Sequence, residues 1–197
     1  MNFKQFNEAK GIEREEAIKN YKPKVYVDMD GVLCDFKSPI AMALGKQTFH
    51  QITNREFDDF FKATNVSEYF AHLPAFPEGR MIIEFVLGLF GSYDICSCPL
   101  RNYKRQSIHG KNRWIRGNLD KKHQPSQAHY VFDKSKYALN EDGKPNILID
   151  DQDNNIKAWK DAGGVALKFE SDHGQFHNLV KELTDALESL RISEVEE

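Results

Sequence analysis

Short apolar runs alternate with longer amphipathic stretches along most of the chain. The short runs combine β-branched and aromatic residues and predict buried strands at 24–27, 93–96, 129–132, 146–149 and 165–169, the last of them edge-like. Apolar residues recur at helical spacing in the stretches 3–21, 53–63, 78–90, 103–119, 153–162 and 175–190. Because strands and helices alternate, we predict an α/β fold in which a mostly parallel sheet carries helices on both faces.

An aromatic-rich segment follows the first predicted strand. It spans 36–76 and exceeds an ordinary strand-to-helix loop, so we predict a small helical cap there. Thr53 and Glu56 have the spacing of a capping box at the start of helix 53–63. The expected organisation is a catalytic core formed by 1–35 and 77–197, with 36–76 as the cap.

Composition and charge exclude several classes of protein. The 197 residues carry a formal charge of −3, which argues against charge-driven binding of nucleic acid. An aromatic content of 12% excludes a disordered chain, and no apolar stretch is long enough to cross a membrane. The charged N-terminus does not resemble a secretion signal. The chain has three cysteines, and Cys96 and Cys98 are too close in sequence to form an ordinary disulfide with each other. We therefore expect these two cysteines to have packing roles, and we expect the protein to be cytoplasmic.

Polar residues stand at the ends of three predicted strands. Asp28 and Asp30 follow the first, Ser97 the second, and the pair Asp150-Asp151 the fourth. Ligands of parallel sheets bind at this edge, and two carboxylate pairs that meet there need a cation. Ligands that are all oxygen favour Mg²⁺, often together with a substrate phosphate. One carboxylate could then attack phosphorus while its neighbour two residues on protonates the leaving oxygen.

Longer motifs around these residues resemble a known superfamily. VYVDMDGVLCDF is similar to the first motif of the haloacid dehalogenase-like (HAD) phosphohydrolases, ICSCPL to the second and ILIDDQDNNI to the fourth. More narrowly, DMDGVLCDF, HLPAFPEG, ICSCPLRNY, GKNRWI and LIDDQ, in this order, resemble the 5′(3′)-deoxyribonucleotidase family. The resemblance covers most of residues 24–160 and implies a Rossmann-like HAD fold.

The resemblance also implies roles for the acidic residues. Asp28 matches the nucleophile, and Asp30 matches the general acid and base that offers its backbone carbonyl to Mg²⁺. Asp150 matches an acidic metal ligand, and Asp151 its partner in positioning metal-bound water. The implied metal ligands are therefore Asp28, Asp30 and Asp150.

Phosphate-binding residues are implied in the same way. Ser97 matches the hydroxyl of the second motif, and Cys98 replaces the serine that usually follows it. Arg101 stands where the family has a basic residue on the phosphate side. Lys111 matches the lysine that neutralises the phosphate and the nucleophile, and its register with Trp114 and Ile115 favours it. Competing basic residues are Lys104, Arg105, Arg113, Lys134 and Lys136.

The sequence thus predicts a Mg²⁺-dependent phosphomonoesterase that works through an aspartyl-phosphate. The resemblance implies a 5′-nucleotidase that dephosphorylates nucleoside monophosphates, and a homodimer as a family-level expectation. Alternatives are a HAD phosphatase for a sugar phosphate or a nucleic-acid end, and a catalytically idle nucleotide-binding module. Phe49, Phe60 and Phe61 are candidates for the substrate pocket, although cap aromatics more often form a core.

Overall fold

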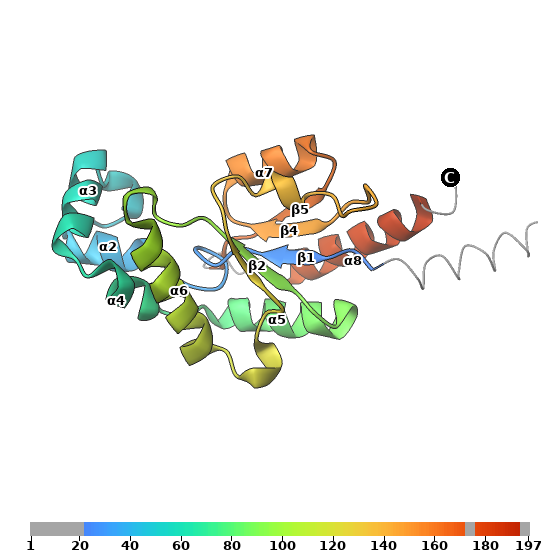
Figure 1. Cartoon of the computed structure of the whole chain (residues 1–197), viewed down its shortest axis with the longest axis horizontal. Coiled ribbons are helices and arrows are strands. Elements are labelled where there is room, and N and C mark those ends of the chain that lie inside the picture. Colours follow the sequence, from blue (N-terminus) through green and yellow to red (C-terminus); the bar gives the residue numbers. More distant parts are fainter. Residues whose placement is uncertain (1–21, 172–175, 194–197) are drawn as a thin grey trace, which may run out of the picture.

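A computed structural model describes residues 22–171 and 176–193 (Figure 1). The helix predicted over 3–21 lies outside these residues. In the described part of the chain, five parallel strands form one sheet in the order β3-β2-β1-β4-β5. The strands are β1 (Val25–Val27), β2 (Asp94–Ser97), β3 (Ala128–Tyr130), β4 (Ile147–Asp150) and β5 (Val165–Lys168). The predicted α/β fold with a parallel sheet is confirmed, and β5 lies at an edge as expected.

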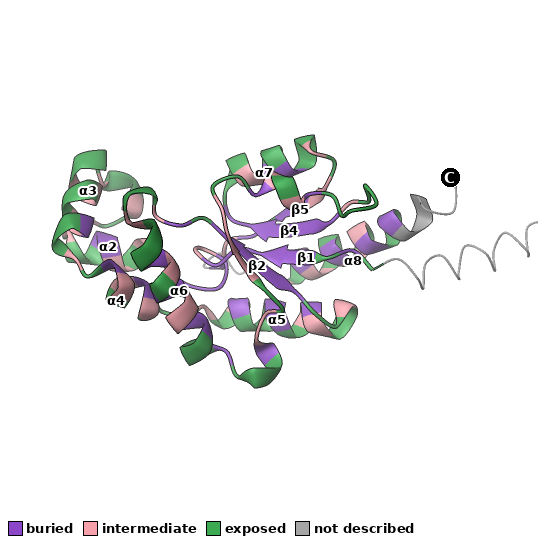
Figure 2. Ribbon diagram, in the orientation of Figure 1, coloured by how far each residue is buried: buried purple, intermediate pink, exposed green. Residues whose placement is uncertain are grey.

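Both faces of the sheet are covered by helices. Val25 and Val27 face a core completed by α5 (Pro77–Phe90) and α8 (Phe176–Ser193). Tyr26 points to the opposite face, where Trp159 of α7 (Asp153–Asp161) packs against it. Figure 2 shows β1, β2 and β4 coloured as buried along their length. This double covering explains why the strands read as continuous apolar runs in the sequence.

The segment predicted as a cap is helical. It contains α2 (Lys37–Ala43), the 3₁₀ turn η1 (Phe49–Gln51), α3 (Asn54–Ala63) and α4 (Val66–Ala71). The capping box is confirmed, because the Glu56 N–H donates to the Thr53 hydroxyl at 3.2 Å and the Thr53 N–H donates to the Glu56 carboxylate at 2.9 Å. The interior of the segment is an aromatic cluster formed by Phe36, Phe49, Phe57, Phe60, Phe61, Tyr69 and Phe70.

Two short linkers join this segment to the sheet and run antiparallel to each other. The Asp35 N–H donates to the Pro74 carbonyl at 2.8 Å, and the Phe76 N–H donates to the Leu33 carbonyl at 3.0 Å. The chain therefore enters and leaves the helical segment at neighbouring points. A Cβ on Gly79 would lie 2.8 Å from the Leu33 Cα, so α5 begins in tight contact with the first linker.

Helix α6 (Lys104–Asn118) belongs to the sheet region by sequence and to the helical segment by packing (Figure 1). A Cβ on Gly110 would lie 2.5 Å from the Ser67 carbonyl oxygen, so glycine permits close contact with α4. The Trp114 indole N–H donates to the Leu73 carbonyl at 2.8 Å, next to the second linker. Helix α6 thus ties α4 to the core. The remaining 3₁₀ turns are η2 (Arg101–Tyr103), η3 (Lys121–His123) and η4 (Ser135–Tyr137).

Each predicted strand and helix within the described residues is present, and no end shifts by more than three residues. The largest difference at a strand is β3, which ends at Tyr130 although the apolar pattern continues to Phe132. Phe132 is exposed, so it extends the apolar run without joining the sheet. None of the described helices has the length and apolar character needed to span a membrane.

Candidate active site

The carboxyl ends of β1, β2 and β4 bring the predicted acidic and hydroxyl side chains together. β1 lies between β2 and β4 in the sheet, so Asp28, Ser97 and Asp150 stand on adjacent strands. All three side chains are buried. The Asp28 N–H donates to the Ile149 carbonyl at 2.9 Å, which continues the β1–β4 ladder up to this residue. Regular strand pairing therefore sets the spacing of these groups.

Three buried carboxylates form a candidate metal centre. One oxygen each from Asp28, Asp150 and Asp151 lies within 4.8 Å of the other two. Burial and the nearby Asp28 carboxylate raise the pKa of Asp150 to about 6. Burial likewise raises the pKa of Asp151. A cluster in which negative charge is this unfavourable, and in which every ligand atom is oxygen, fits a hard divalent cation such as Mg²⁺.

Lys134 contacts two of these carboxylates. Its ammonium lies 3.0 Å from Asp28 Oδ1 and 2.5 Å from Asp150 Oδ2, and its side chain is buried. Burial opposes the charge, but the two carboxylates outweigh it and raise the pKa of Lys134. The contact with Asp28 that the sequence predicts for Lys111 is thus made by Lys134. Its position, shortly after a predicted strand end, is the signal that could have identified it.

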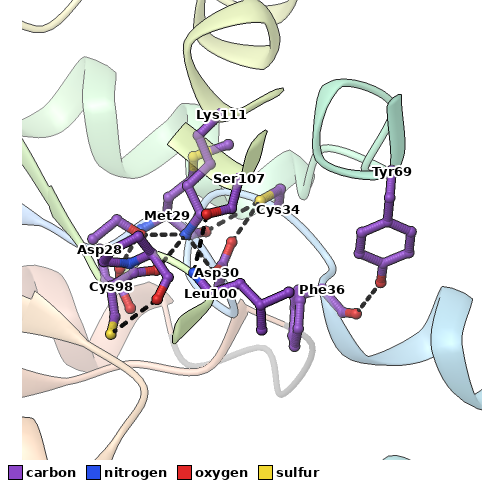
Figure 3. A network of polar contacts seen from close by, with 12 residues as sticks. Asp28, Met29, Asp30, Cys34, Phe36, Tyr69, Cys98, Leu100, Ser107 and Lys111 are labelled. Atoms are coloured by element: carbon purple, nitrogen blue, oxygen red, sulfur yellow. Dashed lines mark hydrogen bonds and ion pairs between the residues drawn. The ribbon is translucent and has the colours of Figure 1, made fainter. Parts of the chain in front are cut away.

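Lys111, on α6, extends toward Asp30 and Cys98 (Figure 3). Its ammonium donates to Asp30 Oδ2 at 2.6 Å, to the Ser97 hydroxyl at 2.7 Å and to the Cys98 carbonyl at 3.0 Å. The structure therefore brings together Lys111 and Ser97, two of the predicted phosphate-side residues, and Asp30, the predicted acid and base. Burial, as the largest cause, raises the pKa of Asp30, although Lys111 opposes that shift.

Gly31 makes the sharp turn after the two aspartates possible. Its φ is +87°, a conformation that side-chain-bearing residues rarely adopt. A Cβ at this position would lie 2.5 Å from the Asp151 carboxyl carbon. The glycine that allows this turn therefore also makes room for Asp151.

Several polar contacts that the sequence pattern does not predict hold the carboxylates at the end of β4 in place. The Asn155 amide donates to both oxygens of Asp150, at 3.0 and 3.1 Å, and the Gln152 N–H donates to Asp150 Oδ1 at 2.8 Å. Lys37, at the start of α2, forms a 2.9 Å ion pair with Asp151. Asn155 lies about one helical turn after Asp150 and Asp151, and this spacing could have predicted its contact with Asp150. Lys37 is distant in sequence, so only the fold reveals it.

Two predicted phosphate-side residues lie at the rim of the site. Cys98 is exposed, and its carbonyl rather than its thiol contacts Lys111. Cys96 is buried, so the expectation that both cysteines pack in the core is wrong for Cys98. Arg101 is exposed in η2, with its guanidinium 5.3 Å from the centre of the Phe132 ring. Among the described residues, Arg101 has no ion pair with the site carboxylates, and its phosphate contact stays a prediction.

Two cavities are lined by residues of the helical segment, and the first of them also reaches the site carboxylate Asp151. The first, of about 560 Å³, lies beside Asp151 and Gly31 and is lined on the cap side by Lys37 and Phe49. The second, of about 490 Å³, lies between α3 and the turn η2; its lining includes Asn54, Phe57, Phe61, Arg101, Asn102 and Tyr103. These two spaces are the candidate binding places for the part of a ligand that lies beyond its reacting group.

The three cap phenylalanines differ in their surroundings. Phe49 is half-buried and lines the first cavity. Phe61 is 1% exposed and belongs mainly to the aromatic interior, although it also contributes to the wall of the second cavity. Phe60 packs edge-on against Phe61 and Tyr69. Phe49 and Phe61 thus adjoin space that a ligand could fill, whereas the contacts of Phe60 are with other cap aromatics.

Comparisons with known proteins show similarity at the level of the fold. No protein-family model and no curated protein matches the sequence. A solved structure from Thermotoga maritima, assigned as a beta-phosphoglucomutase, is 17% identical with a TM-score of 0.50, and the match covers 82% of this chain and 99% of that one. A HAD family enzyme from Bacteroides thetaiotaomicron, solved with magnesium and inorganic phosphate, is 16% identical with a TM-score of 0.49, over 80% of this chain and 99% of that one. The chain is similar in fold to the Thermotoga protein, which agrees with the predicted fold class.

Proposed function

We propose that the chain is a HAD-type, Mg²⁺-dependent phosphomonoesterase that works through an aspartyl-phosphate at Asp28. The observation that carries the proposal is the carboxylate cluster of Asp28, Asp150 and Asp151, with the Lys134 ammonium against two of its members. Asp30 stands two residues beyond Asp28 and pairs with a separate lysine, Lys111. A nucleophile, an acid and base, and two cations thus meet at one sheet edge, as phosphoryl transfer requires.

The residues divide the chemistry between them. In the first step Asp28 forms a bond to phosphorus, the bond to the leaving oxygen breaks, and protonated Asp30 gives its proton to that oxygen. In the second step Asp30, now a carboxylate, takes a proton from water as the water oxygen bonds to phosphorus and Asp28 is released. Lys134 holds positive charge beside Asp28 throughout. Mg²⁺, held by Asp28, Asp150 and the Asp30 carbonyl with Asp151 orienting its waters, would offset charge on the phosphoryl oxygens.

A nucleoside monophosphate is the proposed substrate. The second cavity supports it, because the half-buried rings of Phe57 and Tyr103 offer apolar surface to a nucleobase, and the amides of Asn54 and Asn102 offer hydrogen bonds to its edge. A sugar phosphate would use the polar groups but not the rings. We accordingly propose a 5′-nucleotidase that acts on a small phosphomonoester, with the cytoplasmic location and the homodimer as further predictions from the sequence.

Phosphate release from a panel of esters tests the proposal. Nucleoside 5′-monophosphates, sugar phosphates and a 5′-phosphorylated oligonucleotide are incubated with the full chain, with Mg²⁺ or with excess EDTA. We expect Mg²⁺-dependent release that is fastest from nucleoside monophosphates. Asp28→Asn should abolish it, whereas Asp142→Asn, at an exposed position, should have no effect.

Each other outcome of this panel counts against a defined part of the proposal. Release that is faster from sugar phosphates or from the oligonucleotide would overturn the substrate and keep the chemistry. Undiminished release by Asp28→Asn would overturn the nucleophile. No release from any ester, with nucleotide binding retained, would indicate an idle nucleotide-binding module.

A further inference from the structure

The ammonium of Lys111 is completely enclosed and all of its donors are used. The side chain has 0% exposure, and its three hydrogen bonds go to Asp30, Ser97 and the Cys98 carbonyl. An ammonium has three donors, so none remains for another acceptor unless one of these bonds breaks. The ring of Phe70, from the cap, lies 5.1 Å from the same ammonium and covers it. A phosphate oxygen would have to displace one of these partners to bind Lys111.

Asp30 depends on Lys111 for its orientation. The Asp30 carboxylate places Oδ2 2.6 Å from the ammonium, and its other oxygen, Oδ1, lies 3.8 Å from the Cys34 sulfur, which is a weak donor. Among the described residues, Lys111 is the one cation paired with Asp30. Its carboxylate is 23% exposed, so without this bond the side chain has room to rotate toward solvent.

The backbone that carries Lys111 is held firmly. Gly110, the preceding residue, packs against Ser67 and Phe70 of α4 at a distance that no larger residue allows. Three residues later, the Trp114 indole is hydrogen-bonded to the Leu73 carbonyl. The position of the ammonium is therefore set by the contact between α6 and the cap, not by a flexible side chain alone.

We propose that Lys111 is a positioning residue, which holds the Asp30 carboxyl group where it can pass its proton to the leaving oxygen. The inference rests on the proposed phosphomonoesterase function and deepens it. Proton transfer requires a hydrogen bond of about 2.6–3.2 Å between the acid and the oxygen. A displacement of about 1 Å at such a group can cost about 100-fold in rate. Lys111 acts through Asp30 and leaves the phosphate to Lys134 and the other groups of the site.

Leaving groups that differ in their need for a proton test this role. A nucleoside 5′-monophosphate leaves as an alkoxide and needs the proton, whereas p-nitrophenyl phosphate leaves as a stable phenolate. Lys111→Met keeps the length of the side chain and removes its donors. We expect kcat for the nucleotide to fall about 100-fold or more, kcat for the aryl ester to fall less than about tenfold, and KM for both to change little.

Matched variants keep the test decisive. Lys121→Met, at an exposed position outside the site, removes the same charge and should leave both esters unaffected. The double variant Asp30→Asn with Lys111→Met should be no slower on the nucleotide than Asp30→Asn alone, because Lys111 acts through Asp30. If thermal melting shows that Lys111→Met is unfolded, Lys111→Gln is measured with the same two esters.

Two results would overturn the role. Equal losses of kcat for the two esters, or a rise in KM for both, would show that Lys111 binds the phosphate itself. Additive losses in the double variant would show that it acts independently of Asp30. Failure of the proposed function is distinguishable, because the unmodified chain would then release no phosphate from either ester.

Discussion

In the absence of metal, the buried carboxylate of Asp150 lowers the free energy of unfolding. Burial and the neighbouring Asp28 carboxylate raise its pKa from 3.8 to about 6. A difference of about 2 pKa units corresponds to about 3 kcal/mol at about 1.4 kcal/mol per unit. That is the approximate free energy by which the ionised carboxylate destabilises the metal-free fold near neutral pH.

Replacement of Asp150 by asparagine should therefore stabilise the metal-free protein. The attraction of Lys134 is already contained in the pKa of Asp150, but the amide must turn its NH₂ group toward a donor that the carboxylate accepts from, the Asn155 amide or the Gln152 N–H, which offsets about 1 to 2 kcal/mol of the gain. We expect a net gain of about 1 to 2 kcal/mol, or a rise of about 2–8 °C in the midpoint of thermal unfolding in EDTA. Millimolar Mg²⁺ should raise the midpoint of the unmodified chain and leave that of Asp150→Asn unchanged.

The pH dependence has a defined sign. The folded protein holds a proton on Asp150 up to about pH 6, whereas the unfolded chain releases it near 3.8. The destabilisation is therefore fully present above about pH 6 and disappears as the pH falls toward about 4. The advantage of Asp150→Asn over the unmodified chain should shrink across this window.

Melting curves in EDTA at several pH values check both expectations. Asp161→Asn, which removes an exposed carboxylate, serves as the control and should change the unfolding free energy by less than about 0.5 kcal/mol. A folded Asp150→Asn variant that melts below the unmodified chain near neutral pH would refute the reasoning. It would mean that the attraction of Lys134 outweighs the cost of burial.

Three further predictions concern other parts of the site and cap. Gly31→Ala should lose most phosphatase activity in a release assay, because it strains the turn at φ +87° and its methyl group meets Asp151; full activity would contradict the tight packing. Lys37→Gln should bind Mg²⁺ several-fold more tightly by calorimetry, since the competing cation is gone; weaker binding would mean that Lys37 orients Asp151 instead. Thr53→Ala should lower the unfolding free energy by about 1 kcal/mol in denaturant titrations, whereas Thr53→Ser should not. Equal losses in the two variants would show that the N-cap hydrogen bond of Thr53 is not the cause.

The sequence predicts the layout of the sheet well because strand burial leaves a direct pattern. Apolar runs that end in acids or a hydroxyl locate Asp28, Ser97 and Asp150 without tertiary information. The register of Lys111 with Trp114 and Ile115 correctly indicates that this lysine faces inward, since all three residues share the buried side of α6. The sequence pattern does not show which residue pairs with a charged side chain that faces inward.

The two lysines show this limit. Lys134 follows β3 by a few residues, in a loop whose path no periodicity describes, and the bend of that loop carries its ammonium to Asp28. Lys37 meets Asp151 across 114 positions of sequence. Both contacts depend on how loops and the cap fold back over the sheet edge. They are consequences of tertiary packing, so local patterns cannot specify them.

The helical segment begins and ends at neighbouring points of the core, because the two linkers that join it to the sheet are hydrogen-bonded to each other. Because Leu33–Asp35 and Pro74–Phe76 lie hydrogen-bonded side by side, a tight turn could replace everything between them at small entropic cost. Helix α6 works against such an excision, since the bare face at Gly110 and the enclosed charge of Lys111 would lose their cover. A graft of another cap onto this core would need the matching surface of α6 as well. A functional replacement of the helical segment would therefore have to include the α6 surface around Gly110 and Lys111.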